Sequence, residues 1–218
     1  HGSQGDGLLA GALLLKEGRR LRFILKKQLL SDPCLDVVGH RIPNYFVDRD
    51  SLNNKDELTN IGLLARDMAD DEALIIFPEG TRFSTEKLGK AIAALSETAP
   101  TRVKSASELR SVLPPRTAGT LAALAESNAD IVICNHVGIS DISSLQQLRA
   151  AVPLQTELKF KLWRTPRSEV NQTQFVQWLD AQWAIVDDWV TNNEDVTSPL
   201  SKPASLNANE IATTIEKE

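Results

Sequence analysis

Short apolar runs that alternate with segments of helical periodicity most constrain the fold of this chain. Residues 73–77 form the clearest run, and Pro78 ends it because proline cannot donate a hydrogen bond to a strand ladder. Residues 45–47 and 129–134 have the same character, and residues 54–68 place apolar side chains at helical spacing after a capping-box signature. Because buried strands separated by helices are typical of parallel sheets, we predict an α/β sandwich with a largely parallel mixed sheet flanked by helices.

The remaining periodic segments complete one predicted domain over residues 1–190. Alternating polar and apolar residues predict a strand with one solvated face over residues 158–162. Further predicted elements are a helix over 7–17 that starts at Asp6 and ends at Gly18, a short apolar segment over 21–25, a helical insertion over 83–113, and helices over 119–126 and 175–190. Residues 191–218 are polar and aperiodic, so we expect a disordered tail.

Composition narrows the class of protein. The 218 residues are 42% hydrophobic and 24% charged, which suits a globular domain with a substantial core. The longest uncharged apolar run, residues 7–15, is shorter than the about 20 residues that a membrane-spanning helix needs. Cys34 and Cys134 lie far apart in a chain of ordinary size, so they indicate neither a disulfide framework nor a metal site, and a reducing setting is the default.

The charges are unevenly distributed along the chain. The net charge is −5, but residues 1–30 carry six basic and two acidic residues, whereas residues 171–218 carry eight acidic residues and two lysines. A basic segment on an acidic protein suits an anionic substrate or an anionic lipid surface. A solvated helix face explains such charges equally well, so both interpretations stay open.

The sharpest chemical signal is Phe77-Pro78-Glu79-Gly80-Thr81-Arg82, directly after a predicted strand. Glycine permits a tight turn, and ligands of such sheets bind beyond the carboxyl ends of the strands. A planar guanidinium can hold a phosphate by two hydrogen bonds, and the backbone amides of a turn add donors. We therefore predict a phosphate site at Arg82, with Glu79, Gly80 and Thr81 shaping the turn.

A second arginine, Arg49, follows the strand predicted over residues 45–47. Two strand ends that each present a guanidinium compensate the charge of a phosphate monoester better than one. The alternative is that Arg49 pairs with Asp48, Asp50 or another carboxylate at the strand end.

A histidine and an aspartate five residues apart, His1 and Asp6, stand at the start of the chain. On a continuous helix they would diverge by roughly 140°, so they can meet only through a turn, which Gly2 and Gly5 permit. Asp6 would then accept a hydrogen bond from one imidazole nitrogen and leave the other as a general base. Alternatively, the first three residues are the remnant of an expression tag.

His136 and Asp141 repeat this spacing after the strand predicted over residues 129–134. They are a rival base and orienting carboxylate. The other interpretation is a strand-to-helix turn in which Asn135 and Asp141 are caps and His136 is a satisfied polar residue.

The chain contains, in this order, the box from His1 to Asp6, the sequence Phe46-Val47-Asp48-Arg49 and the hexapeptide at 77–82. These three motifs and their order resemble those of the lysophosphatidate acyltransferase family of glycerolipid acyltransferases. The resemblance covers roughly residues 1–125 and, by motif order, favours His1 with Asp6 over the pair at 136 and 141. It implies that His1 is the general base, that Asp6 orients it, and that Arg49 and Arg82 hold the acceptor phosphate. Arg116, in a basic proline-to-glycine stretch similar to the family's, is a further candidate for substrate contact.

The resemblance also implies the reaction and its setting. A fatty acyl group would pass from acyl-CoA or acyl carrier protein to the free hydroxyl of lysophosphatidate, in phospholipid biosynthesis, without a metal, another cofactor or nucleic acid. We expect a peripheral enzyme at the cytoplasmic face of a membrane, with an asparagine and a membrane-binding helical segment upstream of His1. The strand over 130–135 departs from the family pattern because it lacks the proline of the last motif.

Other functions fit parts of the sequence. The acceptor could be another lysophospholipid or an acylated amine, or the chain could be a non-catalytic binder of lipid or phosphate. A Gly-x-Ser-x-Gly nucleophile turn is absent from the sequence, which disfavours a serine hydrolase. Tryptophans on the helix over 175–190 favour either a membrane interface or packing on the core.

Overall fold

The computed structural model describes residues 6–27, 43–47, 54–139, 147, 150 and 157–193. Three parallel strands form the first sheet, with β1 (Arg20–Lys26) in the centre between β2 (Asn44–Val47) and β3 (Glu72–Ile75). Lys26 of β1 is level with Val47 of β2, and Phe23 of β1 is level with Ile75 of β3. The parallel pairing confirms the predicted α/β class for this part of the chain.

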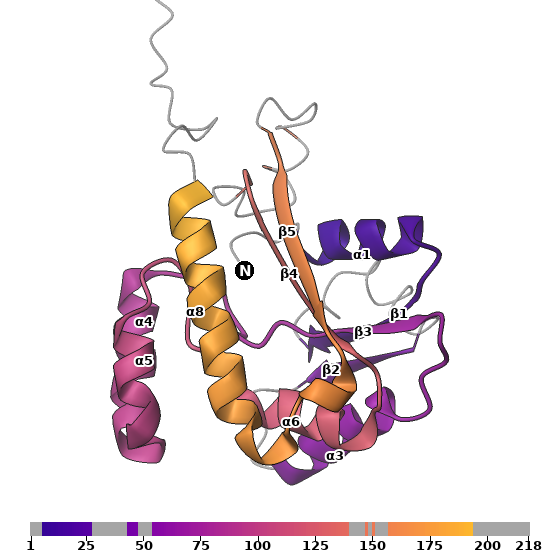
Figure 1. Ribbon diagram of the computed structural model, residues 1–218, viewed down its shortest axis with the longest axis horizontal. Helices are drawn as coiled ribbons and strands as arrows, with labels where there is room; N and C mark the ends of the chain where they lie inside the picture. Colours follow the sequence, from indigo (N-terminus) through magenta and orange to yellow (C-terminus); the bar gives the residue numbers. More distant parts are fainter. Residues whose placement is uncertain are drawn as a thin grey trace, which may run out of the picture.

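Helices cover both faces of this sheet (Figure 1). On one face lies α1 (Asp6–Lys16), where a Cβ added to Gly11 would touch the side chains of Leu21 and Phe23 at 3.5 Å. Gly18 has a φ of 72°, in the left-handed region that glycine tolerates, at the turn from α1 into β1. The predicted helix and its glycine terminator are therefore confirmed.

On the other face, α3 (Asn54–Ala65) and α6 (Thr117–Glu126) pack against each other (Figure 1). Glycines allow the close approach. A Cβ on Gly62 would lie 3.0 Å from the Glu126 side chain, and one on Gly119 would lie 3.4 Å from the Ile61 side chain. Both helices lie within or close to the predicted segments.

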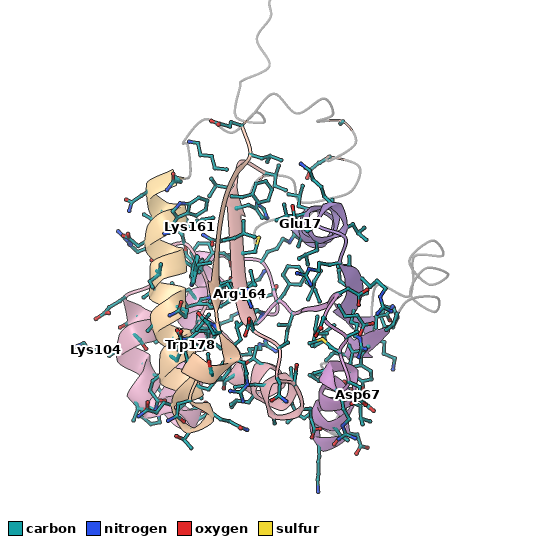
Figure 2. The ribbon with its side chains drawn as sticks, turned by 45° about the vertical axis from the view of Figure 1, so that its right-hand side comes forward. Glu17, Asp67, Lys104, Lys161, Arg164 and Trp178 are labelled. Carbon is teal, nitrogen blue, oxygen red and sulfur yellow. The ribbon has the colours of Figure 1, made fainter. Side chains whose placement is uncertain are left out.

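The strands β4 (Ile131–Val137) and β5 (Lys159–Thr165) form a separate antiparallel pair. Figures 1 and 2 show this pair between α1 and the long C-terminal helix α8 (Phe175–Asn193). The described strands thus form two sheets, whereas the sequence predicts one mixed sheet. Hydrophobic pattern identifies a strand but not the partner it pairs with, which is why the prediction was wrong on this point.

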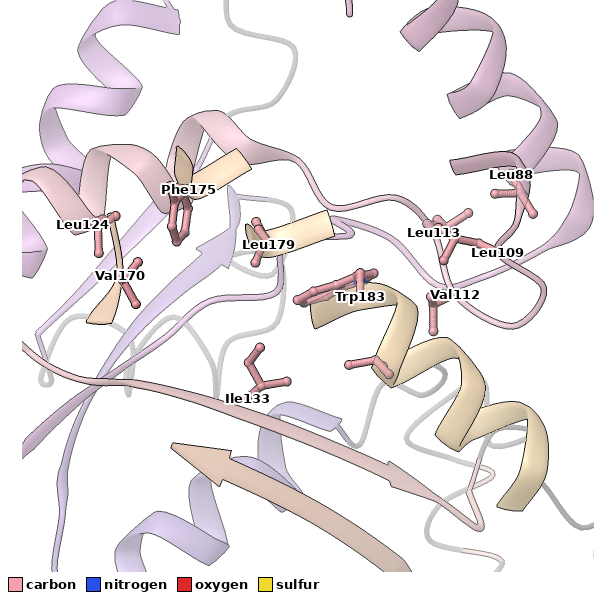
Figure 3. Packing of buried hydrophobic residues seen from close by; sticks show 11 residues of the cluster. Leu88, Leu109, Val112, Leu113, Leu124, Ile133, Val170, Phe175, Leu179 and Trp183 are labelled. Carbon is pink, nitrogen blue, oxygen red and sulfur yellow. The ribbon is translucent and has the colours of Figure 1, made fainter. Parts of the chain in front are cut away.

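The hydrophobic core lies between α8, β4 and the segment that joins β3 to α6 (Figure 3). That segment, predicted as a helical insertion, folds into α4 (Thr85–Thr98), the 3-10 turn η2 (Pro100–Arg102) and α5 (Val103–Ser107). Two short 3-10 turns, η3 (Arg167–Glu169) and η4 (Gln172–Gln174), precede α8. The buried face of α8 consists of Phe175, Leu179, Trp183 and Val186, which confirms that this helix packs on the core.

A buried carboxylate joins α8 to the loop after α5. Asp187 is 3% exposed, and its Oδ1 accepts hydrogen bonds from the backbone N–H groups of Arg110, Ser111 and Val112 at 2.8, 2.7 and 3.2 Å. The loop therefore has its amides satisfied by one side chain of α8 instead of by secondary structure. This contact fixes the loop that runs on to Leu113.

The C-terminal helix extends to Asn193, three residues beyond its predicted end. The rest of the predicted tail, residues 194–218, lies outside the described residues. Within the ranges that the structure describes, no helix is both long enough and apolar enough to cross a membrane.

Candidate active site

The hexapeptide at 77–82 forms a turn at the carboxyl end of β3. The strand ends at Ile75, two residues before the predicted end, and the Gly80 N–H donates to the Phe77 carbonyl at 3.0 Å. Gly80 has a φ of 74°, which a residue with a Cβ rarely adopts. This conformation accounts for the glycine at this position of the turn.

The Glu79 carboxylate points into the protein. Glu79 is 5% exposed, and its Oε2 accepts a hydrogen bond from the backbone N–H of Leu113 at 3.0 Å. Next to it, the Pro78 carbonyl accepts a hydrogen bond from the Arg116 N–H at 2.9 Å. Two hydrogen bonds thus join the turn to the segment before α6, and the acid of the motif shapes the turn from its inner side.

Thr81 and Arg82 are half-buried, on the stretch that leads into α4. The Lys87 ammonium, in the first turn of α4, donates to Thr81 Oγ1 at 3.2 Å and to the Arg82 carbonyl at 3.0 Å. Ser84 caps the same helix by accepting from the Lys87 N–H at 3.3 Å. Sequence reasoning missed Lys87, although its place three residues after a helix-capping serine puts it in the first turn of a helix that begins beside the motif.

Arg116 lies directly before α6 and is exposed. Its backbone hydrogen bond to Pro78 brings it beside the motif turn, 38 positions after that proline in the sequence. The structure therefore brings together five of the six predicted substrate-binding positions, namely Glu79, Gly80, Thr81, Arg82 and Arg116. No single sequence pattern predicts that Arg116 lies beside the turn, because this contact depends on the backbone N–H groups of Leu113 and Arg116.

The predicted base and second arginine fall outside what the structure describes. His1 and Arg49 belong to residues 1–5 and 48–53, and Asp6 is described only as the first residue of α1. The parallel strands place the end of β2, which precedes Arg49, and the end of β3, which precedes the hexapeptide, at one edge of the sheet. Figure 1 shows that α1 begins on that same side, since it runs back over β1.

Two arginines of the basic N-terminal segment have structural partners. Arg20 donates to both carboxylate oxygens of Asp71 at 2.7 and 2.8 Å, and Arg22 forms an ion pair with Glu72. These contacts lie at the start of β3, whereas the hexapeptide follows its end. The interpretation as an anion-binding surface is therefore not supported for these two arginines.

The same ion pairs shift the pKa values of the groups involved. The hydrogen bond from Arg20 is the main cause that lowers the pKa of Asp71 below its ordinary value. The pKa of Glu72 is lowered mainly by the Ala69 N–H, which donates to its carboxylate at 3.0 Å, and then by Arg22. Both carboxylates are held in their charged forms as structural groups.

The rival histidine, His136, lies within β4 and not in a strand-to-helix turn. It is paired with Phe160 of β5, and the two ring centroids are 5.8 Å apart. Asn135 also lies within β4 and is 7% exposed, so the expectation that it caps a helix is wrong. Asp141, the proposed partner of His136, lies outside the described residues.

Residues 1–103 match the acyltransferase family model. The match covers somewhat less than half of the 218 residues, so it shows similarity to acyltransferases over that part of the chain. No curated protein and no solved structure matches the chain significantly.

The matched stretch, which we call the acyltransferase segment, contains α1, α3 and α4 and the positions of His1, Asp6, Arg49 and the hexapeptide. Arg116 and Leu113 lie beyond it and contact it through the two hydrogen bonds to the turn. The part of the chain after the acyltransferase segment thus supports the turn from its inner side.

Proposed function

We propose that this protein transfers a fatty acyl group from acyl-CoA or acyl carrier protein to the free hydroxyl of lysophosphatidate. The observation that carries the proposal is the turn at 77–82 within the acyltransferase segment, fixed from inside by Glu79 and bordered by Arg82, Lys87 and Arg116. A turn with basic side chains at the carboxyl end of a parallel strand is suited to bind a phosphate monoester.

In this mechanism His1 takes the proton from the acceptor hydroxyl, and the hydroxyl oxygen attacks the thioester carbonyl. A carbon–oxygen bond forms, the tetrahedral intermediate collapses, and the carbon–sulfur bond breaks. The departing thiolate receives the proton from the imidazolium, so the products are the new ester and a free thiol. Asp6 orients the imidazole and stabilises its charged form.

Arg49 and Arg82 hold the acceptor phosphate, and Arg116 contacts it from the side of α6. A backbone amide of the turn, at Thr81, stabilises the oxyanion of the tetrahedral intermediate, because the Gly80 N–H already donates to the Phe77 carbonyl. The reaction needs no metal or further cofactor, and we expect no nucleic-acid partner. Because both substrates are amphiphiles, the enzyme works at a membrane surface, as a peripheral protein on the cytoplasmic face.

The experiment that tests this function measures transfer of radiolabelled acyl from acyl-CoA by the purified chain. The acceptors are lysophosphatidate, a lysophospholipid whose phosphate is a diester, and a monoacylglycerol without phosphate. The proposal expects the highest kcat/KM with lysophosphatidate. Equal rates with all three acceptors would point to another acyl acceptor, and binding of lysophosphatidate without turnover would point to a non-catalytic relative.

The role of the base is tested by replacing His1 by alanine. Loss of turnover in the His1→Ala variant, with lysophosphatidate binding retained, supports His1 as the base. Retained turnover would move the assignment to His136, which is checked by His136→Ala in the same assay.

A further inference from the structure

We propose that Lys87 supplies a further positive charge to the acceptor-phosphate site and thereby favours phosphate monoesters over other acceptors. This inference rests on the proposed function and adds a specificity-determining residue that the sequence motifs do not contain. Lys87 lies five residues after Arg82, in the first turn of α4, and its side chain reaches back to the turn.

The Lys87 ammonium is held in place and keeps donor capacity. Its Nζ donates to Thr81 Oγ1 at 3.2 Å and to the Arg82 carbonyl at 3.0 Å. An ammonium has three N–H donors, so these two acceptors leave one for an oxygen of a ligand. Lys87 is exposed, so solvent and ligand can reach it.

The acids close to Lys87 in the sequence are directed elsewhere. Glu86 pairs with Lys90, one helical turn along α4, at 2.5 Å. Glu79, the acid of the hexapeptide, is buried and accepts from the Leu113 N–H. The exposed Lys87 ammonium therefore contacts the turn at Thr81 and at the Arg82 carbonyl, while the Glu79 carboxylate is buried.

This arrangement has a chemical consequence for the acceptor. A phosphate monoester carries close to two negative charges at neutral pH, whereas a diester carries one and a monoacylglycerol carries none. A second cation next to Arg82 stabilises binding of the doubly charged phosphate more than binding of the other groups, because each charge-assisted hydrogen bond needs an ionised oxygen. Lys87 thus affects which acceptor is preferred and not the acyl-transfer step itself.

The test compares Lys87→Met, Lys87→Arg and the matched control Lys90→Met, all in the full chain. Lys90 lies on the same helix, is 75% exposed and pairs with Glu86, so its loss removes a charge without touching the turn. We expect Lys87→Met to raise the KM for lysophosphatidate by about tenfold or more, with kcat changed by less than about twofold. Lys87→Arg restores most of the affinity, and Lys90→Met behaves as the wild type.

The acceptor panel separates this role from a merely structural one. The Lys87→Met effect on KM is expected to be large for lysophosphatidate and small for the monoacylglycerol. An equal effect on both acceptors, or no rescue by arginine, would overturn the inference.

Direct binding separates the inference from the proposed function. Calorimetry with glycerol 3-phosphate as a soluble probe is expected to show binding to the wild type and at least about tenfold weaker binding to Lys87→Met. If acyl transfer fails but this difference holds, the reaction is wrong and the phosphate site stands. If the wild type neither binds the probe nor prefers the monoester, the inference is wrong.

Discussion

Glu79 Oε2 accepts a hydrogen bond from the backbone N–H of Leu113 at 3.0 Å, across 34 positions of the sequence. Glu79 is 5% exposed and Leu113 is 3% exposed, so water does not replace this contact easily. The hydrogen bond connects the acyltransferase segment to the chain that follows it. It explains why an acid is present in a turn whose outer side is basic.

The first prediction concerns this contact. Glu79→Ala leaves the Leu113 N–H buried without its carboxylate acceptor, and we expect a loss of about 1–3 kcal/mol in the free energy of unfolding. Glu79→Gln keeps a side-chain oxygen that can accept, so its loss is smaller. Urea denaturation of the two variants measures the difference, and equal stability of Glu79→Ala and the wild type would show that the contact contributes nothing.

The second prediction compares two glycines. Gly80 has a φ of 74°, and a Cβ there would strain the turn by about 1–2 kcal/mol. Gly89, inside α4, has no atom within 4 Å of an added Cβ. We expect Gly80→Ala to lower the melting temperature, and Gly89→Ala to raise it or leave it unchanged because alanine favours a helix. Thermal unfolding checks both, and a Gly80→Ala variant as stable as Gly89→Ala would contradict the turn geometry.

The third prediction concerns the link between α8 and the loop before Leu113. Asp187→Ala removes one acceptor from three backbone N–H groups, and we expect a loss of about 3 kcal/mol or more. Asp188 is the matched control, because its side chain is 71% exposed and its loss should change stability by less than about 1 kcal/mol. Similar stabilities of the two alanine variants in urea denaturation would refute this assignment.

The helices and strands were largely predictable, because their apolar periodicity and their stop signals are local. Gly18 ends α1 as expected, and the stripe from Phe175 to Val186 is the buried face of α8. The separation of β4 and β5 into their own sheet was not predictable from pattern, since it depends on which strands pair. The motif turn after β3 was predicted from its residues alone.

The residues that contact the turn, Leu113 and Lys87, could not be predicted from the sequence. Leu113 contributes through its backbone N–H, which every residue except proline possesses, so its identity gives no signal. Lys87 resembles the other lysines of a polar helix, and only the direction of its side chain distinguishes it from Lys90. The placement of His1 and Arg49 stays a prediction, because both lie outside the described residues.

The fourth prediction is a pH dependence at the start of β3. The Ala69 N–H and Arg22 lower the pKa of Glu72 below its ordinary value of 4.5. A carboxyl whose pKa is lowered on folding stabilises the fold above its unfolded pKa, and this contribution is lost as the pH falls through the folded value. We expect Glu72→Gln to melt below the wild type at pH 7. The difference in melting temperature between the two proteins should narrow as the pH falls below about 4.5. A difference that stays constant from pH 7 to pH 3 would contradict a stabilising role of the charged Glu72 carboxylate.

The central claim is that the turn at 77–82 holds the acceptor phosphate through Arg82, and the most direct measurement is acceptor KM in Arg82→Ala. The matched control is Arg66→Ala, which removes a 49% exposed arginine that pairs with Glu126. We predict that Arg82→Ala raises the KM for lysophosphatidate by about ten- to a hundredfold and leaves the KM for monoacylglycerol nearly unchanged, while Arg66→Ala changes neither. Wild-type KM values for both acceptors in Arg82→Ala would contradict the account.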